Sequence, residues 1–327
     1  MGKKTVRAGV VGVGYLGRFH AEKYASLAGV ELVGVADPDS EQGQRVAKAC
    51  ACDYYPDYRR LLADVDAVSI AVPTSLHHLV GRDCLAAGVD ILMEKPVTVT
   101  LDEADELIAM AEEKSLIFQV GHLERFNPAV QAMIPFLTQP LFIESNRISV
   151  FKKRGVDVDV VLDLMIHDID IILNIVKSPI RQIHTVGAPV ATMTTDIANA
   201  RLIFENGVTA NVTASRISRT NIRKMRIFQP GSYINVDFAN RKIMTIRLKD
   251  ELMASGMPRQ DVAVTTFAEG DALKSEISHF IENVRNRTQP SVSGQEGRRA
   301  LAVAHEVISQ IKQHQRLPAF QGYFQKP

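Results

Sequence analysis

The 327-residue sequence predicts an α/β protein of two domains, a doubly wound parallel sheet followed by a mostly antiparallel, open-faced sheet. Three observations lead to this fold class. The chain is about twice as long as a typical domain of ~150 residues. Over the first 120 residues, short apolar runs alternate with helical patterns, as in parallel sheets with helices on both faces. Strand-like stretches dominate the remainder, and the hairpin signal Asn206-Gly207 joins two of them.

The elements of the first domain, residues 1–123, follow from the length and periodicity of its apolar segments. Strands buried on both faces are continuous apolar runs, whereas helices repeat apolar residues every three to four positions. Asp102 is favoured near a helix start, where a carboxylate meets the positive end of the helix dipole. We predict strands at residues 6–13, 31–36, 67–72, 90–93 and 117–120, and helices at 17–27, 77–87 and 101–114.

The second domain, residues 124–327, is predicted to place its helices on one face of the sheet. The other face is then open, and an exposed sheet favours self-association. We therefore expect a homodimer or homotetramer formed through that face. The predicted strands are 141–150, 180–186, 198–204, 208–214, 224–228, 233–238 and 243–248, and the predicted helices are 160–176, 272–286 and 295–313.

Composition and charge exclude several classes of protein. A formal net charge of +1 gives no overall field for nucleic acid or a membrane surface, so we expect neither as a partner. The sequence has no apolar run of 18 residues and leaves no room for a signal peptide before the first strand. Its three cysteines, Cys50, Cys52 and Cys84, lack partners at metal-ligand spacing. We expect a soluble, cytoplasmic protein without a metal.

The strongest local signal is the segment Gly12-Val13-Gly14-Tyr15-Leu16-Gly17, which follows a predicted strand and opens a predicted helix. Gly12 permits the tight turn, Gly14 lets the backbone approach a pyrophosphate, and Gly17 allows close helix–strand packing. The helix N-terminus supplies free N–H groups for the phosphates. This pattern predicts a Rossmann dinucleotide site. The alternative is a glycine-rich turn without a ligand.

The choice of dinucleotide depends on Asp37, which ends the second predicted strand, 20 residues after Gly17. Its carboxylate can accept hydrogen bonds from both ribose hydroxyls and would repel a 2′-phosphate. Pro38 and Asp39 follow, and no arginine stands where NADP-binding proteins usually have one. The sequence therefore predicts NAD as the cofactor.

Three further motifs carry a family resemblance: Pro73-Thr74-Ser75-Leu76-His77 after the third strand, Glu94-Lys95-Pro96 after the fourth, and Asp163-Leu164-Met165-Ile166-His167 in the long helix of the second domain. With the glycine segment, they closely resemble the Gfo/Idh/MocA oxidoreductases over nearly the whole chain. The resemblance implies a Rossmann domain, an open-faced sheet domain, and redox chemistry at a sugar or polyol hydroxyl.

Site residues are carried over from the family motif by motif. The resemblance implies Lys95, Asp163 and His167 as catalytic residues. Thr74 stands where many members have Asn, and Met165 where many have Gly, which puts the cofactor contacts and the pocket wall in doubt. The implied cofactor-binding residues are Gly12, Gly14, Tyr15, Leu16, Gly17, Asp37, Pro73, Thr74, His77, Glu94 and Lys95.

The chemistry explains these residue types. Removing a hydride from a carbinol carbon also requires a base for the hydroxyl proton. Asp163 and His167 lie four positions apart and so share a helix face. Lys95 ends a parallel strand, where ligands bind in such sheets. Either Lys95 or His167 can be the primary base, and either isomer of the Lys95–Pro96 bond is open. The alternative is a core histidine and a solvated lysine.

A basic loop, Lys152, Lys153 and Arg154, precedes the Asp163–His167 helix and suits a sugar diphosphate. Arg216, Arg219 and Arg223 are candidates for the same patch, and the alternative is a solvated loop. Within the family, residues 121–129 and 160–172 most resemble a branch that oxidises the C3 hydroxyl of UDP-N-acetylglucosamine. We include Arg125 and Asn127 as substrate-binding residues, although Asn127 and Pro128 also form a helix start.

Two other functions stay open at this point. One is an inositol or free-sugar dehydrogenase of the same family, and the other is a non-catalytic dinucleotide-binding regulator. The presence of Lys95, Asp163 and His167 favours an enzyme. The remaining histidines have no partner that the sequence identifies, and we interpret them as structural or surface residues: His20, His78, His184, His279, His305 and His314.

Overall fold

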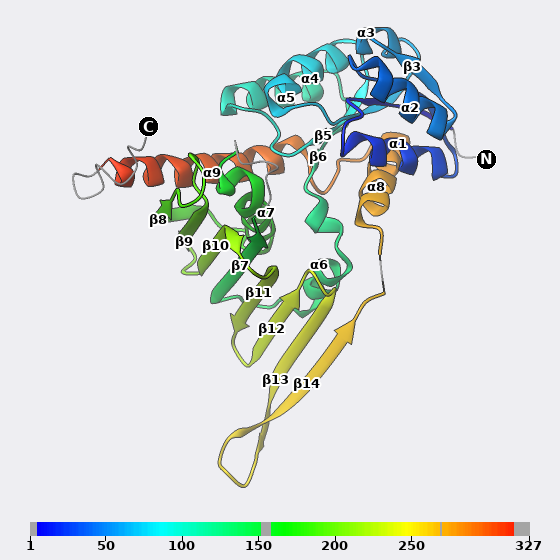
Figure 1. Cartoon of the computed structure of the whole chain (residues 1–327). Coiled ribbons are helices and arrows are strands. Elements are labelled where there is room, and N and C mark those ends of the chain that lie inside the picture. Colours follow the sequence, from blue (N-terminus) through cyan, green and yellow to red (C-terminus); the bar gives the residue numbers. More distant parts are fainter. Residues whose placement is uncertain (1–4, 152–157, 269, 317–327) are drawn as a thin grey trace. The chain divides into compact units, whose positions relative to one another are not determined.

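The computed structural model describes residues 5–151, 158–268 and 270–316 (Figure 1). The chain divides into two compact units. The first consists of Met1–Phe126 and Asp271–Arg298, and the second of Asn127–Gly270 and Arg299–Pro327. The α/β fold class is as predicted, with a parallel sheet in the first unit and a mostly antiparallel sheet in the second.

The first unit is built on six parallel strands in the order β3-β2-β1-β4-β5-β6. Chain order reverses beside β1, which is the arrangement of a Rossmann sheet. The central strands are mostly apolar because helices cover both faces, and Val10, Val68 and Leu92 are completely buried. The bounds are β1 Val6–Val11, β2 Val30–Ala36, β3 Asp53–Tyr55, β4 Ala67–Ile70, β5 Asp90–Glu94 and β6 Phe118–Gly121.

The helices of this unit begin at local capping signals. At α5, Thr100 accepts the N–H of Glu103, while the Glu103 side chain accepts the N–H of Thr100. Asp39 caps α2. The bounds are α1 Gly17–Ser26, α2 Ser40–Cys50, α3 Tyr58–Leu61, η1 Thr74–Leu76, α4 His77–Ala86, α5 Leu101–Glu113, η2 Leu123–Phe126 and α8 Ala272–Asn286.

Helix α8 packs in the core of the first unit, although the predicted division after residue 123 kept its residues in the second domain. Ile277 and Phe280 are buried in one cluster with Ala21 and Tyr24 of α1. Helical periodicity identified an apolar face on this helix, but periodicity does not say which core that face joins.

The second unit contains an eight-stranded sheet in the order β14-β13-β12-β11-β7-β10-β9-β8. Only β7 and β10 pair in parallel. The Asn206-Gly207 hairpin is confirmed, because Thr209 pairs with Ile203 and Gly207 has a φ of +88°. The bounds are β7 Phe142–Val150, β8 Ile180–Ala188, β9 Ile197–Phe204, β10 Thr209–Ser218, β11 Ile222–Gln229, β12 Ser232–Asp237, β13 Lys242–Leu252 and β14 Pro258–Thr266.

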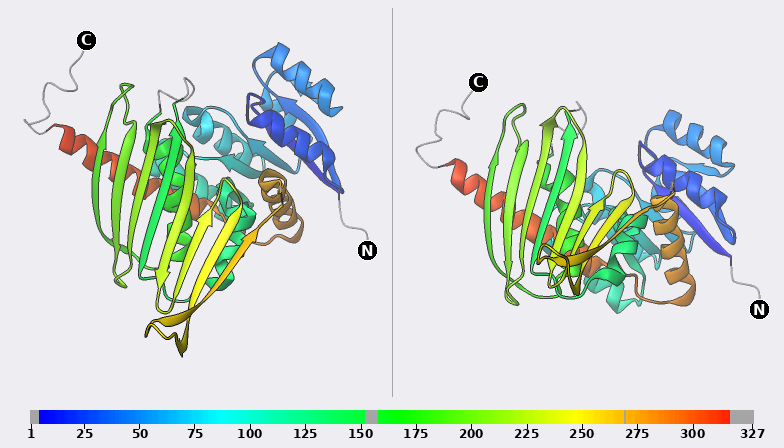
Figure 2. Two further views of the ribbon diagram at one scale, coloured as in Figure 1. Left: turned by 60° about the horizontal axis from the view of Figure 1, so that its bottom comes forward. Right: turned by 90° about the horizontal axis from the view of Figure 1, so that it is seen from below.

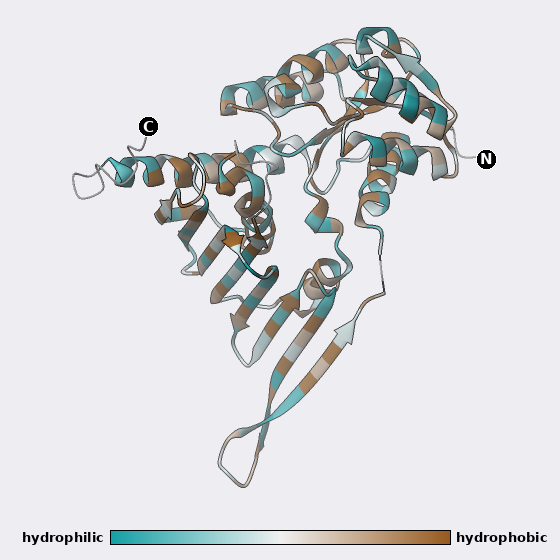
Figure 3. Cartoon of the chain, viewed as in Figure 1, coloured by the Kyte–Doolittle hydropathy of each residue, from teal (hydrophilic) through white to brown (hydrophobic). Residues whose placement is uncertain are grey.

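Helices cover one face of this sheet, and the left view of Figure 2 looks onto the other face. Hydrophobic and hydrophilic residues alternate along the strands because alternate side chains enter the core (Figure 3). No helix in the described ranges is long and apolar enough to span a membrane. The bounds are α6 Pro128–Met133, η3 Ile134–Phe136, η4 Val161–Met165, α7 Ile166–Ile175 and α9 Gly294–Gln315, which belongs to this unit from Arg299.

Candidate active site

The turn from β1 into α1 has the geometry that a dinucleotide requires. Gly12 has a φ of +83°, and its N–H donates to the Ala36 carbonyl at 2.8 Å. A Cβ on Gly17 would lie 1.8 Å from the Gly12 oxygen, so the turn itself excludes any other residue there. No described atom lies within 4 Å of a Cβ built on Gly14. That open space is where a pyrophosphate would approach the backbone.

No side chain caps the start of α1. Leu16 occupies the N-cap position without a side-chain hydrogen bond to the helix, and no acidic residue stands in the first turn. Tyr15 and Leu16 are exposed. The Arg18 guanidinium lies 5.4 Å from the Tyr15 ring centroid and adds positive charge beside the turn. An uncapped helix N-terminus with a nearby cation fits an anionic ligand.

Asp37 stands at the end of β2, where its carboxylate faces the glycine turn. The Val13 N–H donates to Oδ2 at 2.8 Å, and the Asp39 N–H donates to Oδ1 at 2.9 Å. A carboxylate has about four acceptor positions, so two remain for ribose hydroxyls. These contacts hold the carboxylate next to Gly14, as expected for a residue that reads the ribose of NAD.

Replacing Gly14 with alanine is expected to weaken NAD binding about tenfold or more without lowering the melting temperature. The added methyl group meets no described atom of the protein, so it opposes only the ligand. Calorimetric titration of NAD, with a thermal melt of the free protein, checks both parts. Gly17→Ala is the matched control, because its Cβ would collide with the Gly12 oxygen and destabilise the fold. Unchanged NAD affinity in Gly14→Ala would remove Gly14 from the site.

The loops that follow β4 and β5 meet around His77. Pro73 and Thr74 begin η1, and the buried His77 ring lies with Nδ1 2.9 Å from the Pro96 oxygen and Nε2 3.0 Å from the Val72 oxygen. Burial lowers the pKa of His77, although both backbone contacts and the Glu94 charge oppose the shift. The ring thus lies between the two loops, and a neutral ring can donate its one N–H to only one of these two oxygens. The peptide bond between Lys95 and Pro96 is cis.

Glu94 and Lys95 end β5, at the carboxyl edge of the sheet. The Glu94 side chain is 15% exposed, and its Oε1 lies 2.9 Å from His20 Nε2. Burial works to raise the pKa of Glu94, but the His20 hydrogen bond and the charges of His20, Lys95 and His77 outweigh it and lower the pKa. Glu94 is therefore an anion beside Lys95.

His20 was missed by the sequence analysis, which treated it as a residue without a partner. Its Nδ1 lies 3.0 Å from Ser69 Oγ, which is 2.8 Å from the hydroxyl of Tyr24. His20 and Tyr24 are four residues apart on the buried face of α1. A buried polar pair directly after a glycine motif is the signal that would have identified them. The hydrogen bonds from Tyr24 through Ser69 to His20 therefore fix the imidazole ring that contacts Glu94.

In the second unit, Asp163 lies in the π-helical turn η4 and His167 in the first turn of α7. The sequence predicted one continuous helix over this segment. π-Helical turns occur frequently at functional sites. Arg147 of β7 donates to Asp168, the residue after His167, from Nε at 2.8 Å and from a terminal nitrogen at 3.0 Å. Both side chains are buried, so this bidentate pair fixes the rotation of α7 and hence the direction of His167.

Arg216 is a structural residue rather than part of a phosphate patch. Its side chain is buried, lies 3.5 Å from Asp196, and donates to the carbonyl oxygens of Val158 and Thr195. The N–H of Val160 donates to the same Thr195 oxygen at 3.1 Å. The guanidinium thus holds the segment that leads into η4, contrary to the prediction. A buried arginine on a strand cannot be distinguished from an exposed one by its position in the sequence.

The predicted substrate-binding residues lie in different environments. Arg125 is buried in η2 of the first unit. Asn127 caps α6 through the N–H of Ala129, and its amide donates to the Phe238 oxygen at 3.2 Å, so the predicted helix start is confirmed. Whether these two residues also contact substrate stays a prediction. Lys152, Lys153 and Arg154 lie outside the described residues.

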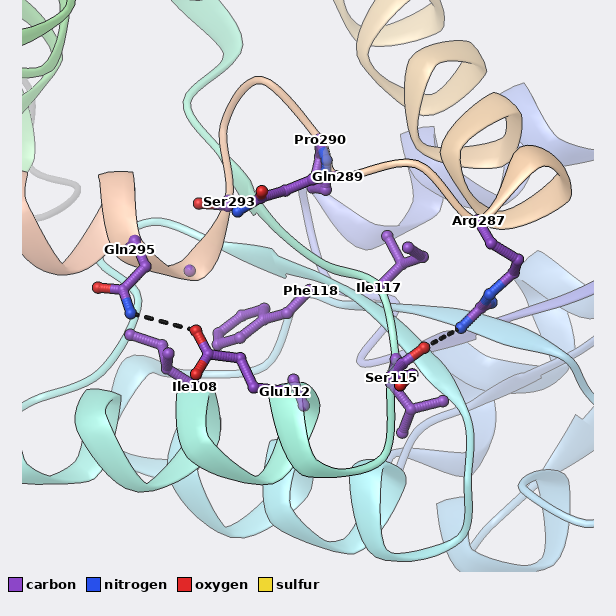
Figure 4. Close-up of a pocket in the computed structure, with 13 residues that line it drawn as sticks. Ile108, Glu112, Ser115, Ile117, Phe118, Arg287, Gln289, Pro290, Ser293 and Gln295 are labelled. Carbon is purple, nitrogen blue, oxygen red and sulfur yellow. Dashed lines mark hydrogen bonds between the residues drawn. The ribbon is translucent and has the colours of Figure 1, made fainter.

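A cavity of about 340 Å³ lies at the opposite, amino-terminal edge of the Rossmann sheet. Figure 4 shows Arg287 reaching the Ser115 oxygen and Gln295 reaching Glu112 across its rim. None of the predicted site residues lines this cavity.

Over the described ranges, no cluster of three or more His, Cys, Asp or Glu side chains is arranged to hold a metal ion.

Comparison with known proteins agrees with this geometry. Residues 6–122 match an oxidoreductase family with an NAD-binding Rossmann fold, and residues 144–229 match the Gfo/Idh/MocA C-terminal domain. Over 307 residues the chain is 40% identical to UDP-N-acetylglucosamine 3-dehydrogenase of Acidithiobacillus ferrooxidans, with 92% of this chain and 96% of that protein covered. The chain belongs to the Gfo/Idh/MocA oxidoreductase family.

Other similarities agree with membership of the Gfo/Idh/MocA family. A solved structure of the same Acidithiobacillus enzyme has a TM-score of 0.89 at 38% identity and covers 98% of this chain and 99% of its own. The chain is 29% identical to scyllo-inositol 2-dehydrogenase (NAD(+)) of Bacillus subtilis over 314 residues, with 88% of this chain and 89% of that protein covered. The protein is therefore an NAD-dependent oxidoreductase acting on a CH–OH group.

Proposed function

We propose that the protein oxidises the C3 hydroxyl of UDP-N-acetylglucosamine to a ketone. One observation carries this proposal: 40% identity over almost the whole chain to an enzyme named UDP-N-acetylglucosamine 3-dehydrogenase. The relative named for scyllo-inositol is 29% identical, so an inositol is the less supported substrate. A non-catalytic regulator would have no need of Lys95, Asp163 and His167 together.

The proposed chemistry assigns each residue a role at one hydroxyl. When bound, NAD supplies the acceptor for the hydride that leaves the carbinol carbon. Lys95, acting as the neutral amine, takes the proton of the substrate hydroxyl and becomes an ammonium, and the neighbouring Glu94 carboxylate stabilises the ammonium that forms. His167, oriented by the Arg147–Asp168 pair, is the second donor and acceptor at the same oxygen. Asp163, four residues before it, flanks the histidine.

The proposed substrate requires cations for its diphosphate, and Lys152, Lys153 and Arg154 are the proposed ones. Calorimetric titration of UDP into the NAD-loaded protein is expected to show binding. Alanine at all three positions should weaken this binding about tenfold or more, because charge-assisted hydrogen bonds to phosphate are lost. The matched control removes three exposed basic residues of β13 and β14, namely Arg247, Lys249 and Arg259. Undetectable UDP binding by the wild-type protein would reject a UDP-sugar.

We also propose that copies of the chain associate through the open face of the eight-stranded sheet. On that face an apolar ladder crosses five strands, from Phe142 through Phe228, Tyr233 and Ile246 to Val262. The ring centroids of the first two pairs are 5.7 and 5.0 Å apart, and Val262 is 51% exposed. A continuous exposed apolar row of this kind marks an interaction surface.

A further inference from the structure

Glu276 of α8 is a buried acid that the proposed chemistry does not use. Its side chain is completely buried, and neither carboxyl oxygen has a hydrogen-bond partner among the residues that the structure describes. Nearly all buried carboxyl groups are hydrogen-bonded or paired with a cation, because burial of an unpaired charge is very costly. An orphaned carboxyl at this depth therefore needs a physical explanation.

The backbone holds Glu276 next to the polar cluster behind Lys95. The side-chain amide of Gln119, on β6, donates to the backbone carbonyl oxygen of Glu276 at 3.3 Å. The side-chain oxygen of the same Gln119 lies 3.0 Å from His279 Nδ1. Gln119 is two residues before Gly121, which pairs with Glu94. A Cβ on Gly121 would lie only 3.3 Å from Glu94 Oε2, so that carboxylate packs directly on β6.

The charges of this cluster decide which acid holds a proton. Its titratable groups are His20 and Tyr24 from α1, Glu94 and Lys95 from β5, His77 from α4, and Glu276 and His279 from α8. Cationic and hydrogen-bonding partners lower the pKa of Glu94 against its burial. Burial raises the pKa of Glu276 well above its ordinary value, and the Glu94 charge raises it further. Two neighbouring buried carboxyls rarely ionise together.

We propose that Glu276 is a positioning residue that keeps its proton, so that the single negative charge of the cluster rests on Glu94 beside Lys95. This inference rests on the proposed function, in which Lys95 takes the substrate proton. An ionised Glu276 would add a second negative charge behind Glu94. That charge would strengthen the hold of Lys95 on its proton and make it a poorer base.

The first test is the pH profile of kcat/KM for oxidation of the sugar. Once Glu276 ionises, wild-type kcat/KM should decline toward a lower plateau as the pH rises, because Lys95 is then a poorer base. Glu276→Gln cannot ionise, so this alkaline decline should disappear while activity at neutral pH is kept. Glu276→Leu cannot ionise either, so a folded Glu276→Leu variant should lose the same alkaline decline. An unchanged alkaline decline in a folded Glu276→Gln variant would overturn the proposal.

Stability gives a second readout with a defined sign. The pKa of Glu276 is raised in the folded state, so between the unfolded and folded pKa values the folded protein binds more protons than the unfolded one. Stability is then lost as pH rises through this window. Glu276→Gln should raise the melting temperature relative to wild type at about pH 8 and by much less at about pH 5. Glu282→Gln, on the exposed side of the same helix, should show no such difference.

Infrared spectroscopy of the wild-type protein keeps the proposal testable if Glu276→Gln does not fold. A protonated carboxylic acid has a carbonyl-stretch band that carboxylates lack. This band should be present in the wild-type protein at about pH 8, where ordinary Asp and Glu side chains are ionised. It should persist in Glu282→Gln and disappear in Glu276→Gln. Its absence from the wild type would overturn the proposal. If Lys95→Met is fully active, the proposed role of Lys95 fails even with the band present, and if the wild-type protein does not oxidise the UDP-sugar, the proposed function fails independently of the band.

Discussion

Replacing Lys95 with methionine is expected to reduce turnover about 100-fold or more, because the group that takes the substrate proton is lost. NAD affinity should be nearly unchanged, since methionine keeps the length of the side chain and the glycine turn lies elsewhere on the sheet edge. Steady-state kinetics and a calorimetric titration of NAD measure the two quantities. Lys48→Met, at an exposed position of α2, is the control for a lost surface charge. Near-normal turnover in Lys95→Met would contradict the proposed mechanism.

Replacing His167 with alanine is expected to lower turnover by a similar factor, about 100-fold, through loss of the second proton-transfer group. The fold should be kept, because Arg147 and Asp168 fix α7 without the imidazole. Kinetics with a thermal melt test both statements. His184→Ala, at an exposed position of β8, serves as the control. If His167→Ala and Lys95→Met both turn over normally, neither residue transfers the substrate proton, and the proposed mechanism is contradicted.

The fold was predictable where one physical signal dominated. The buried parallel strands β1, β4 and β5 are mostly apolar, and the Asn206-Gly207 hairpin follows from turn chemistry. The elements α2, β3, α3 and β14 were not predicted. Helix α2 buries only Gly43, Val46 and Ala47, and β14 is exposed over nearly its whole length. Elements that bury so few residues have only a weak periodic pattern of apolar residues, and the sequence analysis cannot detect it.

The site was predictable where its chemistry is local in sequence. Three parts of the site follow a strand within a few residues, namely the glycine segment, Asp37 and Lys95. Their residue types are characteristic of dinucleotide-dependent oxidoreductases. The contacts of His20 and Glu276 could not be predicted in this way. His20 meets Glu94 across 74 residues, and Glu276 is held by a contact to Gln119 across 157 residues. A buried glutamate in a polar helical segment resembles an exposed one until its packing is known.

The most direct test of the central claim follows the hydrogen that leaves the substrate. The protein is incubated with NAD and UDP-N-acetylglucosamine carrying deuterium at C3, and the reduced cofactor is analysed by mass spectrometry. The proposed function predicts that the reduced cofactor carries one deuterium and that a 3-keto sugar nucleotide appears in equal amount. Unlabelled reduced cofactor would place the oxidation at another carbon. Absence of reduction with this substrate, together with efficient oxidation of an inositol, would contradict the assignment of a UDP-sugar.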